Sequence, residues 1–76
     1  MKISQLQQKI GTRIRDLRES KGISQQNLAA ICNFEKGNLS RIEAGRTNPT
    51  ISTLYKISQA LEITLSELLD VESSLQ

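Results

Sequence analysis

The side chains best suited to binding chemistry in this chain lie in one segment, Ser24–Gly45. Lysine and arginine donate hydrogen bonds, asparagine donates and accepts them, and serine does either. A short helix that carries such a set suits hydrogen bonding to the edges of base pairs in a DNA duplex. The polar residues left free by the apolar spacing of this segment are Lys36, Asn38, Ser40 and Arg41.

Two short helices joined by a tight turn at Asn33 would position these side chains. Among non-glycine residues, asparagine best tolerates the left-handed conformation that such a turn requires. Ser24 is placed to cap the first helix, because its hydroxyl can accept from a free backbone N–H group. Gly45 ends the second helix. The residues expected to pin the two helices together are Leu28, Ala29, Cys32, Leu39 and Ile42.

A long helix is predicted before this pair, from about Ser4 to Lys21, with Gly22 as its C-terminal cap. Its apolar stripe recurs at spacings of three and four residues: Ile3, Leu6, Ile10, Ile14 and Leu17.

Two helices are predicted after the pair, beyond a loop in which Pro49 bars helical structure. The fourth helix is capped by Thr50 or Ser52, and its inward face is Leu54, Ile57 and Leu61. A short fifth helix begins at Thr64 and carries Leu65, Leu68 and Leu69. With no alternating strand pattern, the fold class is all-α.

Length, charge and composition narrow the possible functions. Seventy-six residues allow one domain, expected over residues 1–71 with a frayed acidic tail at 72–76. Residues 1–61 hold all ten Lys and Arg and carry +6, whereas residues 62–76 carry −4. The basic part could face a polyanion, although chance clustering on a solvated surface would give the same balance.

Other functions find no support in the residues. The chain has no His and a single Cys, which excludes an internal disulfide and a zinc site. We expect no membrane span, no signal peptide, no cofactor, no metal and no small-molecule ligand. Cys32 is expected to be a small buried residue, and we expect the protein not to be an enzyme.

This order of elements resembles the Xre/Cro family of phage-repressor-like transcription regulators over residues 9–70. The resemblance rests on the long first helix, the paired short helices with Gln25, Ala29 and Asn33, the loop GRTNPT and the closing LSELL. It implies a lambda-repressor-like DNA-binding domain, a compact five-helix bundle whose third helix enters the major groove of double-stranded DNA.

The base-contacting positions of the family fall on Glu35, Lys36, Gly37 and Arg41, with Asn38 and Ser40 as supplementary contacts. Lys36 and Arg41 suit guanine, whose O6 and N7 accept hydrogen bonds. Gly37 has no side chain, so it either permits close approach of the backbone to DNA or weakens the start of the helix. Glu35 would accept from cytosine, disfavour wrong sites, or simply favour the helix N-terminus.

The phosphate-contacting positions implied by the resemblance are Ser24, Gln25, Arg18, Arg46, Thr47 and Asn48. Gln25 would clamp a phosphate with its side chain and the helix N-terminus. Arg18 is also expected to form a partly buried pair with Glu43 that aims the arginine and stiffens the third helix. The plain alternative for Gln25 is an ordinary helix-start residue, and for the loop it is ordinary turn chemistry. For Arg18 and Glu43 it is two independent surface charges.

The leading hypothesis is therefore a sequence-specific transcriptional regulator, cytoplasmic and associated with the nucleoid of a bacterium or with phage DNA. By resemblance it acts as a homodimer on an inverted repeat, with half-sites about 34–36 Å apart and the subunits joined near Leu65 in the last two helices. The alternative is an antitoxin or other protein-interaction module of the same fold that also represses its own promoter.

Overall fold

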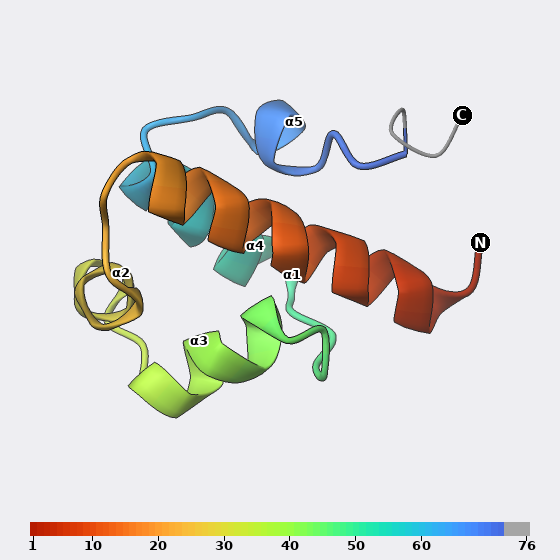
Figure 1. Cartoon of the computed structure of the whole chain (residues 1–76), viewed down its shortest axis with the longest axis horizontal. Coiled ribbons are helices and arrows are strands. Elements are labelled where there is room, and N and C mark those ends of the chain that lie inside the picture. Colours follow the sequence, from red (N-terminus) through yellow and green to blue (C-terminus); the bar gives the residue numbers. More distant parts are fainter. Residues whose placement is uncertain (73–76) are drawn as a thin grey trace.

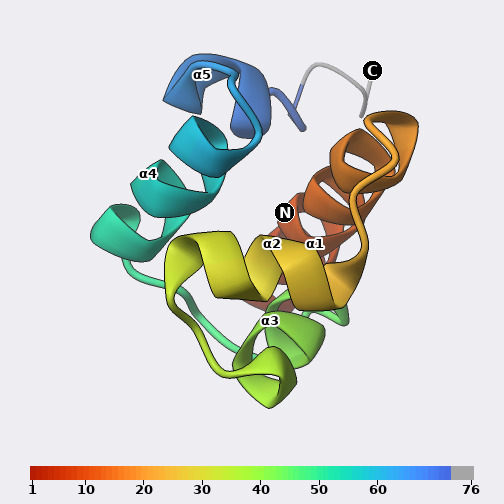
Figure 2. The ribbon, with the colours of Figure 1, turned by 90° about the vertical axis from the view of Figure 1, so that its left-hand side faces the viewer.

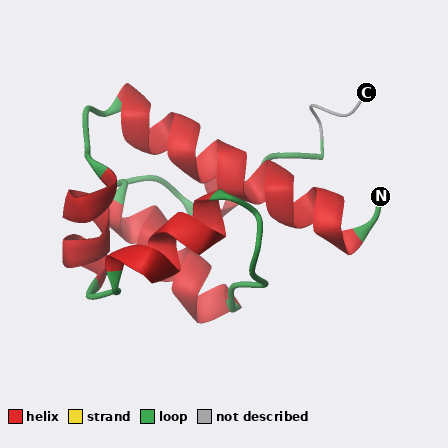
Figure 3. Ribbon diagram, turned by 60° about the horizontal axis from the view of Figure 1, so that its bottom comes forward, coloured by secondary structure: helices red, strands yellow, loops and turns green. Residues whose placement is uncertain are grey.

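The computed structural model describes residues 1–72, and this part of the chain forms five helices and no strand (Figure 1, Figure 3). In chain order they are α1 (Ile3–Ser20), α2 (Gln25–Cys32), α3 (Lys36–Glu43), α4 (Ile51–Ala60) and α5 (Leu65–Leu68). The prediction of an all-α five-helix bundle is confirmed. Of the tail predicted to fray, residues 73–76 lie outside the described part.

The helices close a ring of contacts around one core. α1 packs on α3, α3 on α2, α2 on α4, α4 on α5, and α5 returns to α1. Figure 2 shows this ring, with α3 and α5 at opposite ends of the molecule. Each helix contributes to the fully buried core, which contains Ile14, Leu28, Leu39, Ile57, Leu61 and Leu68. Burying a side chain of this size stabilises the fold by about 1.5–3 kcal/mol.

Local signals set the helix ends where the sequence predicts them. Three cap residues accept a hydrogen bond from the backbone N–H group three residues later: Ser24 at 3.0 Å, Thr50 at 3.2 Å and Thr64 at 3.0 Å. Asn33 adopts the left-handed conformation, with φ 60° and ψ 40°. The paired helices α2 and α3 are therefore joined by the tight turn that the asparagine was expected to make.

The first turn of α1 departs from the prediction. Ile3 belongs to the apolar stripe in sequence, yet it is 64% exposed. The N-terminal end of α1 extends past the other helices, so that no neighbour covers this residue (Figure 1). The periodicity identifies the stripe correctly but does not show where the bundle stops.

Leu65, the expected centre of a subunit contact, packs against the core and is half-buried. The large apolar side chains of the last two helices that stay exposed belong to other residues of α4 and to the end of α5. Among the described residues these are Ile51, Tyr55 and Leu69.

Candidate nucleic-acid interface

The helix α3 has one buried side and one exposed side (Figure 3). Leu39, Ile42 and Glu43 are buried against the neighbouring helices. The exposed residues of the helix are Lys36, Gly37, Ser40 and Arg41.

The other two predicted base-contacting residues occupy less open positions. Asn38 is half-buried, and Glu35 is exposed but lies before the helix as its N-cap, where its side chain makes no capping bond. Lys36, Ser40 and Arg41 thus form the exposed polar group of α3, and the structure places Glu35 at its edge.

The long basic side chains of this exposed side are not engaged by the rest of the protein. Within residues 1–72, neither the Lys36 ammonium nor the Arg41 guanidinium is paired with a carboxylate. Gly37 leaves open space between them: a Cβ atom built there would meet only Nη1 of Arg41, at 3.7 Å. The donors of Lys36 and Arg41 are therefore available to an external acceptor.

The buried side of α3 is fixed by the predicted ion pair, which is confirmed. Arg18 donates from Nε to Oε2 of Glu43 at 2.8 Å and from Nη2 to Oε1 at 3.1 Å. The side chains are 10% and 4% exposed, respectively. The hydrogen bond to the carboxylate raises the pKa of Arg18, which outweighs the opposing effect of burial. This bidentate pair ties α1 to the last turn of α3.

The third bond of Arg18 changes the role expected for it. Its Nη1 donates to the carbonyl oxygen of Ile23 at 2.9 Å, so each nitrogen of the guanidinium has a partner inside the protein. A buried guanidinium with an acceptor on each nitrogen is poorly placed for the phosphate contact that the sequence suggested. We therefore assign Arg18 to holding Glu43 rather than to touching DNA.

Gln25 extends this network to the start of α2. Its Nε2 donates to Oε1 of Glu43 at 3.1 Å. One carboxylate thus joins residues from α1 and α2 to α3 itself. The amide is held beside the first turn of α2, where backbone N–H groups lack partners within the helix. The neighbouring Ser24 uses its hydroxyl oxygen to cap α2.

The predicted phosphate-contacting loop follows α3 directly. Gly45 turns the chain with φ +74° after the last turn of the helix. The backbone N–H group of Arg46 then donates to the carbonyl oxygen of Arg41 at 3.0 Å, which fixes the start of the loop. The side chains of Arg46 and Asn48 are exposed, and Thr47 is half-buried.

Two glycines that the sequence did not mark for this role bring α1 and α3 into backbone contact. A Cβ atom on Gly11 would lie 2.5 Å from the carbonyl oxygens of both Ile42 and Glu43. A Cβ on Gly45 would lie 2.7 Å from Cα of Gln8. Only residues without a side chain allow this approach, so Gly11 and Gly45 set the distance between α1 and the end of α3.

Cys32 and the metal-ligating residue types are the remaining candidates for site chemistry. Burial raises the pKa of the Cys32 thiol, which keeps it protonated and unreactive. No group of metal-ligating side chains occurs within residues 1–72. None of the helices there combines the length and apolar character needed to cross a bilayer.

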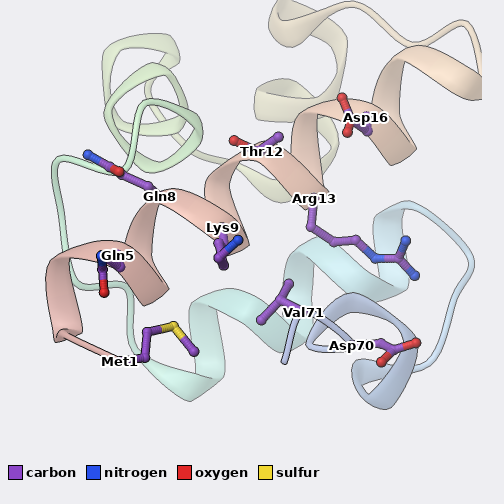
Figure 4. A pocket seen from close by; sticks show the side chains of 9 residues that line it. All are labelled: Met1, Gln5, Gln8, Lys9, Thr12, Arg13, Asp16, Asp70 and Val71. Carbon is purple, nitrogen blue, oxygen red and sulfur yellow. The ribbon is translucent and has the colours of Figure 1, made fainter. Parts of the chain in front are cut away.

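A groove of about 780 Å³ lies along α1 beside Asp70 and Val71 (Figure 4). Lys9, Arg13 and Asp16 line its α1 side. Arg13 there donates from Nε and Nη2 to the carbonyl oxygen of Glu67, at 3.1 and 2.9 Å, and so ties α1 to α5.

Residues 14–68 match the model of the helix-turn-helix family HTH_3. The chain is 41% identical over 59 residues to y4dJ of Sinorhizobium fredii, named as an uncharacterised HTH-type transcriptional regulator, and the match covers 78% of this chain and 77% of y4dJ. The match to this chain spans only 43% to 56% of the length of three further curated relatives, which are also named as HTH-type transcriptional regulators.

Solved structures agree with the fold. The restriction-modification controller protein C.AhdI from Aeromonas hydrophila superposes with a TM-score of 0.78 at 34% identity, covering 80% of this chain and 92% of C.AhdI. The biofilm master regulator SinR, in a crystal structure with DNA, gives a TM-score of 0.75 at 42% identity, covering 80% of this chain and 98% of that SinR chain.

Proposed function

The chain belongs to the HTH_3 family of helix-turn-helix proteins, and from that premise we propose that it binds double-stranded DNA sequence-specifically and regulates transcription. It is not an enzyme, since its family consists of DNA-binding regulators. The observation that carries the proposal is the contrast within α3. One side is fixed by a buried ion pair, and the other presents unpaired cationic donors to solvent.

In the proposed complex, α3 lies in the major groove and reads base edges with its exposed side. Arg41 and Lys36 are the principal readers, because their free donors match the O6 and N7 acceptors of guanine. Ser40 is a supplementary contact from the same side. Asn38, which is half-buried, and Glu35, at the edge, contribute less.

The proposed phosphate contacts lie beside the last turn of the reader helix, at the start of α2 and in the loop that follows α3. Ser24 and Gln25 offer the N-terminus of α2, where backbone N–H groups favour an anion. The exposed side chains of the loop, Arg46 and Asn48, follow the backbone with Thr47. Such contacts fix the register of the protein on DNA without carrying sequence information.

We extend the proposal to a homodimer that binds an inverted repeat in the cytoplasm, on the nucleoid. Its support is the exposed apolar surface of the last two helices, at Ile51, Tyr55 and Leu69. These residues replace the half-buried Leu65 as the centre of the proposed contact. Sedimentation of the wild-type protein should give a dimer, and Tyr55→Ser should raise the dissociation constant of that dimer. A monomer for both proteins would contradict the dimer proposal.

Selection from a random duplex library with the purified protein tests the function itself. We expect enrichment of one short motif, arranged as two inverted half-sites about 34–36 Å apart. Affinity for the selected duplex should fall steeply as salt rises, because phosphate contacts release counterions. No enrichment, or a flat response to salt, would contradict the proposal.

A further inference from the structure

A second hollow of the molecule, of about 360 Å³, lies where α1, α2 and α3 meet. The Arg18–Glu43 pair belongs to its lining, and the residues that give the hollow further polar groups are Arg15, Glu19, Gln25 and Ser40. It therefore combines the predicted phosphate-contacting start of α2 with one exposed residue of α3. Arg15 is the cation of this hollow that lies outside the buried pair, and it has no role in the interface as described so far.

The position of Arg15 follows from the packing of α1. Gly11 faces the end of α3, and Arg15 comes one turn later on the same side of α1. Arg18, the next residue on that side, is bound to Glu43. The close approach made possible by Gly11 thus carries Arg15 to the hollow beside Ala44, at the C-terminal end of α3.

Arg18 has an acceptor on each guanidinium nitrogen, whereas Arg15 has one long contact with a carboxylate. Its one ion pair joins Nε to Oε2 of Glu19 at 3.7 Å, which is beyond the length of a good hydrogen bond. Both side chains are more than half exposed, at 61% and 55%, so water screens the pair and makes it weak. A phosphate offers the guanidinium a bidentate, charge-assisted partner that Glu19 does not supply in this geometry.

We propose that this hollow seats one backbone phosphate of the bound duplex and that Arg15 is its principal ligand. Gln25, the first residue of α2, and Ser40 of α3 line the same hollow. In the free protein Glu19 pairs with Arg15, and it therefore competes with the phosphate for Arg15 when the duplex binds. The inference rests on the proposed function, because it assigns a further contact to the same duplex.

The experiment compares Arg15→Gln with Lys9→Gln, which removes one positive charge from the same helix at the groove beside Asp70 and Val71 (Figure 4). Fluorescence anisotropy measures affinity for the selected duplex and for a scrambled duplex across a salt series. Arg15→Gln should weaken both by about tenfold or more, and should lower the slope of log K against log salt by about one. Lys9→Gln should change affinity by less than about twofold, in keeping with a screened charge.

A double-mutant cycle of Arg15→Gln and Glu19→Gln tests whether Glu19 competes with the phosphate for Arg15. This substitution should raise the affinity of the wild-type chain, and the gain should shrink when Arg15 is already Gln. A gain of equal size in both backgrounds would show only a long-range charge effect and would overturn the competition. Equal losses for Arg15→Gln and Lys9→Gln would overturn the phosphate seat while leaving DNA binding intact. Failure of the wild-type protein to bind any duplex would instead reject the proposed function.

Discussion

An arginine lies at each side of α3, but the two guanidinium groups are bound in opposite ways. On the buried side, Arg18 reaches Glu43 from α1, and each guanidinium nitrogen has an acceptor within the protein. On the exposed side, Arg41 has no carboxylate partner within residues 1–72. The first arginine fixes the helix, and the second is presented by it. A helix held this firmly orders its reader residues before DNA arrives, which lowers the entropic cost of binding.

The largest effect should follow from breaking the buried side. Arg18→Ala leaves the buried Glu43 carboxylate without its cation, with Gln25 still donating to it, and should lower the free energy of unfolding by about 3–5 kcal/mol. Urea denaturation measures this loss. The double variant Arg18→Ala/Glu43→Ala should lose less than the sum of the single variants, because the second change removes the stranded charge. Strict additivity would mean that the pair does not act as a unit.

A smaller effect on the free energy of unfolding is expected from a glycine-to-alanine substitution, with opposite signs on the buried and exposed sides of α3. Gly11→Ala forces a Cβ against the carbonyl oxygens of α3 and should lower the free energy of unfolding by about 1–3 kcal/mol. Gly37→Ala adds a Cβ that makes an ordinary van der Waals contact with the Arg41 side chain, and should raise the free energy of unfolding by up to about 1 kcal/mol, since alanine favours helix. Thermal and urea unfolding of both variants check the pair. A change of the same sign in the two variants would refute the contrast.

The smallest effect on stability is expected for the reader residues themselves. Arg41→Ala and Lys36→Ala remove side chains without partners in the described structure, so the free energy of unfolding should stay within about 0.5 kcal/mol of wild type. The same urea titrations measure it. A loss above about 1 kcal/mol would mean that the exposed side also holds the fold together.

The sequence predicts the turn, the helix caps and the exposed residues of α3 from local signals. Asn33, Ser24 and Thr64 act through the backbone of their own segment, so their types alone indicate turns and caps. The polar residues of α3 were found because helical spacing separates them from Leu39 and Ile42. These signals depend on residues close together in the chain, so the packing of other helices does not alter them.

What the sequence did not reveal depends on how the helices meet. Gly11 reads as an ordinary helix residue until α3 lies against it, and Gly45 reads only as a helix stop. The hollow at Arg15 exists only because α1 crosses α3 at that point. Ile3 was misplaced for the same reason, since periodicity does not tell where a neighbouring helix ends.

The central claim is that the exposed side of α3 reads sequence, and duplex-library selection with Arg41→Ala beside the wild-type protein tests it most directly. The variant should fold as well as the wild type and lose its preference at one base pair of each half-site. On the wild-type site, that loss should amount to about 1–3 kcal/mol of specific binding free energy, with the remaining positions unchanged. An unchanged motif, or a uniform loss on every sequence, would contradict the claim.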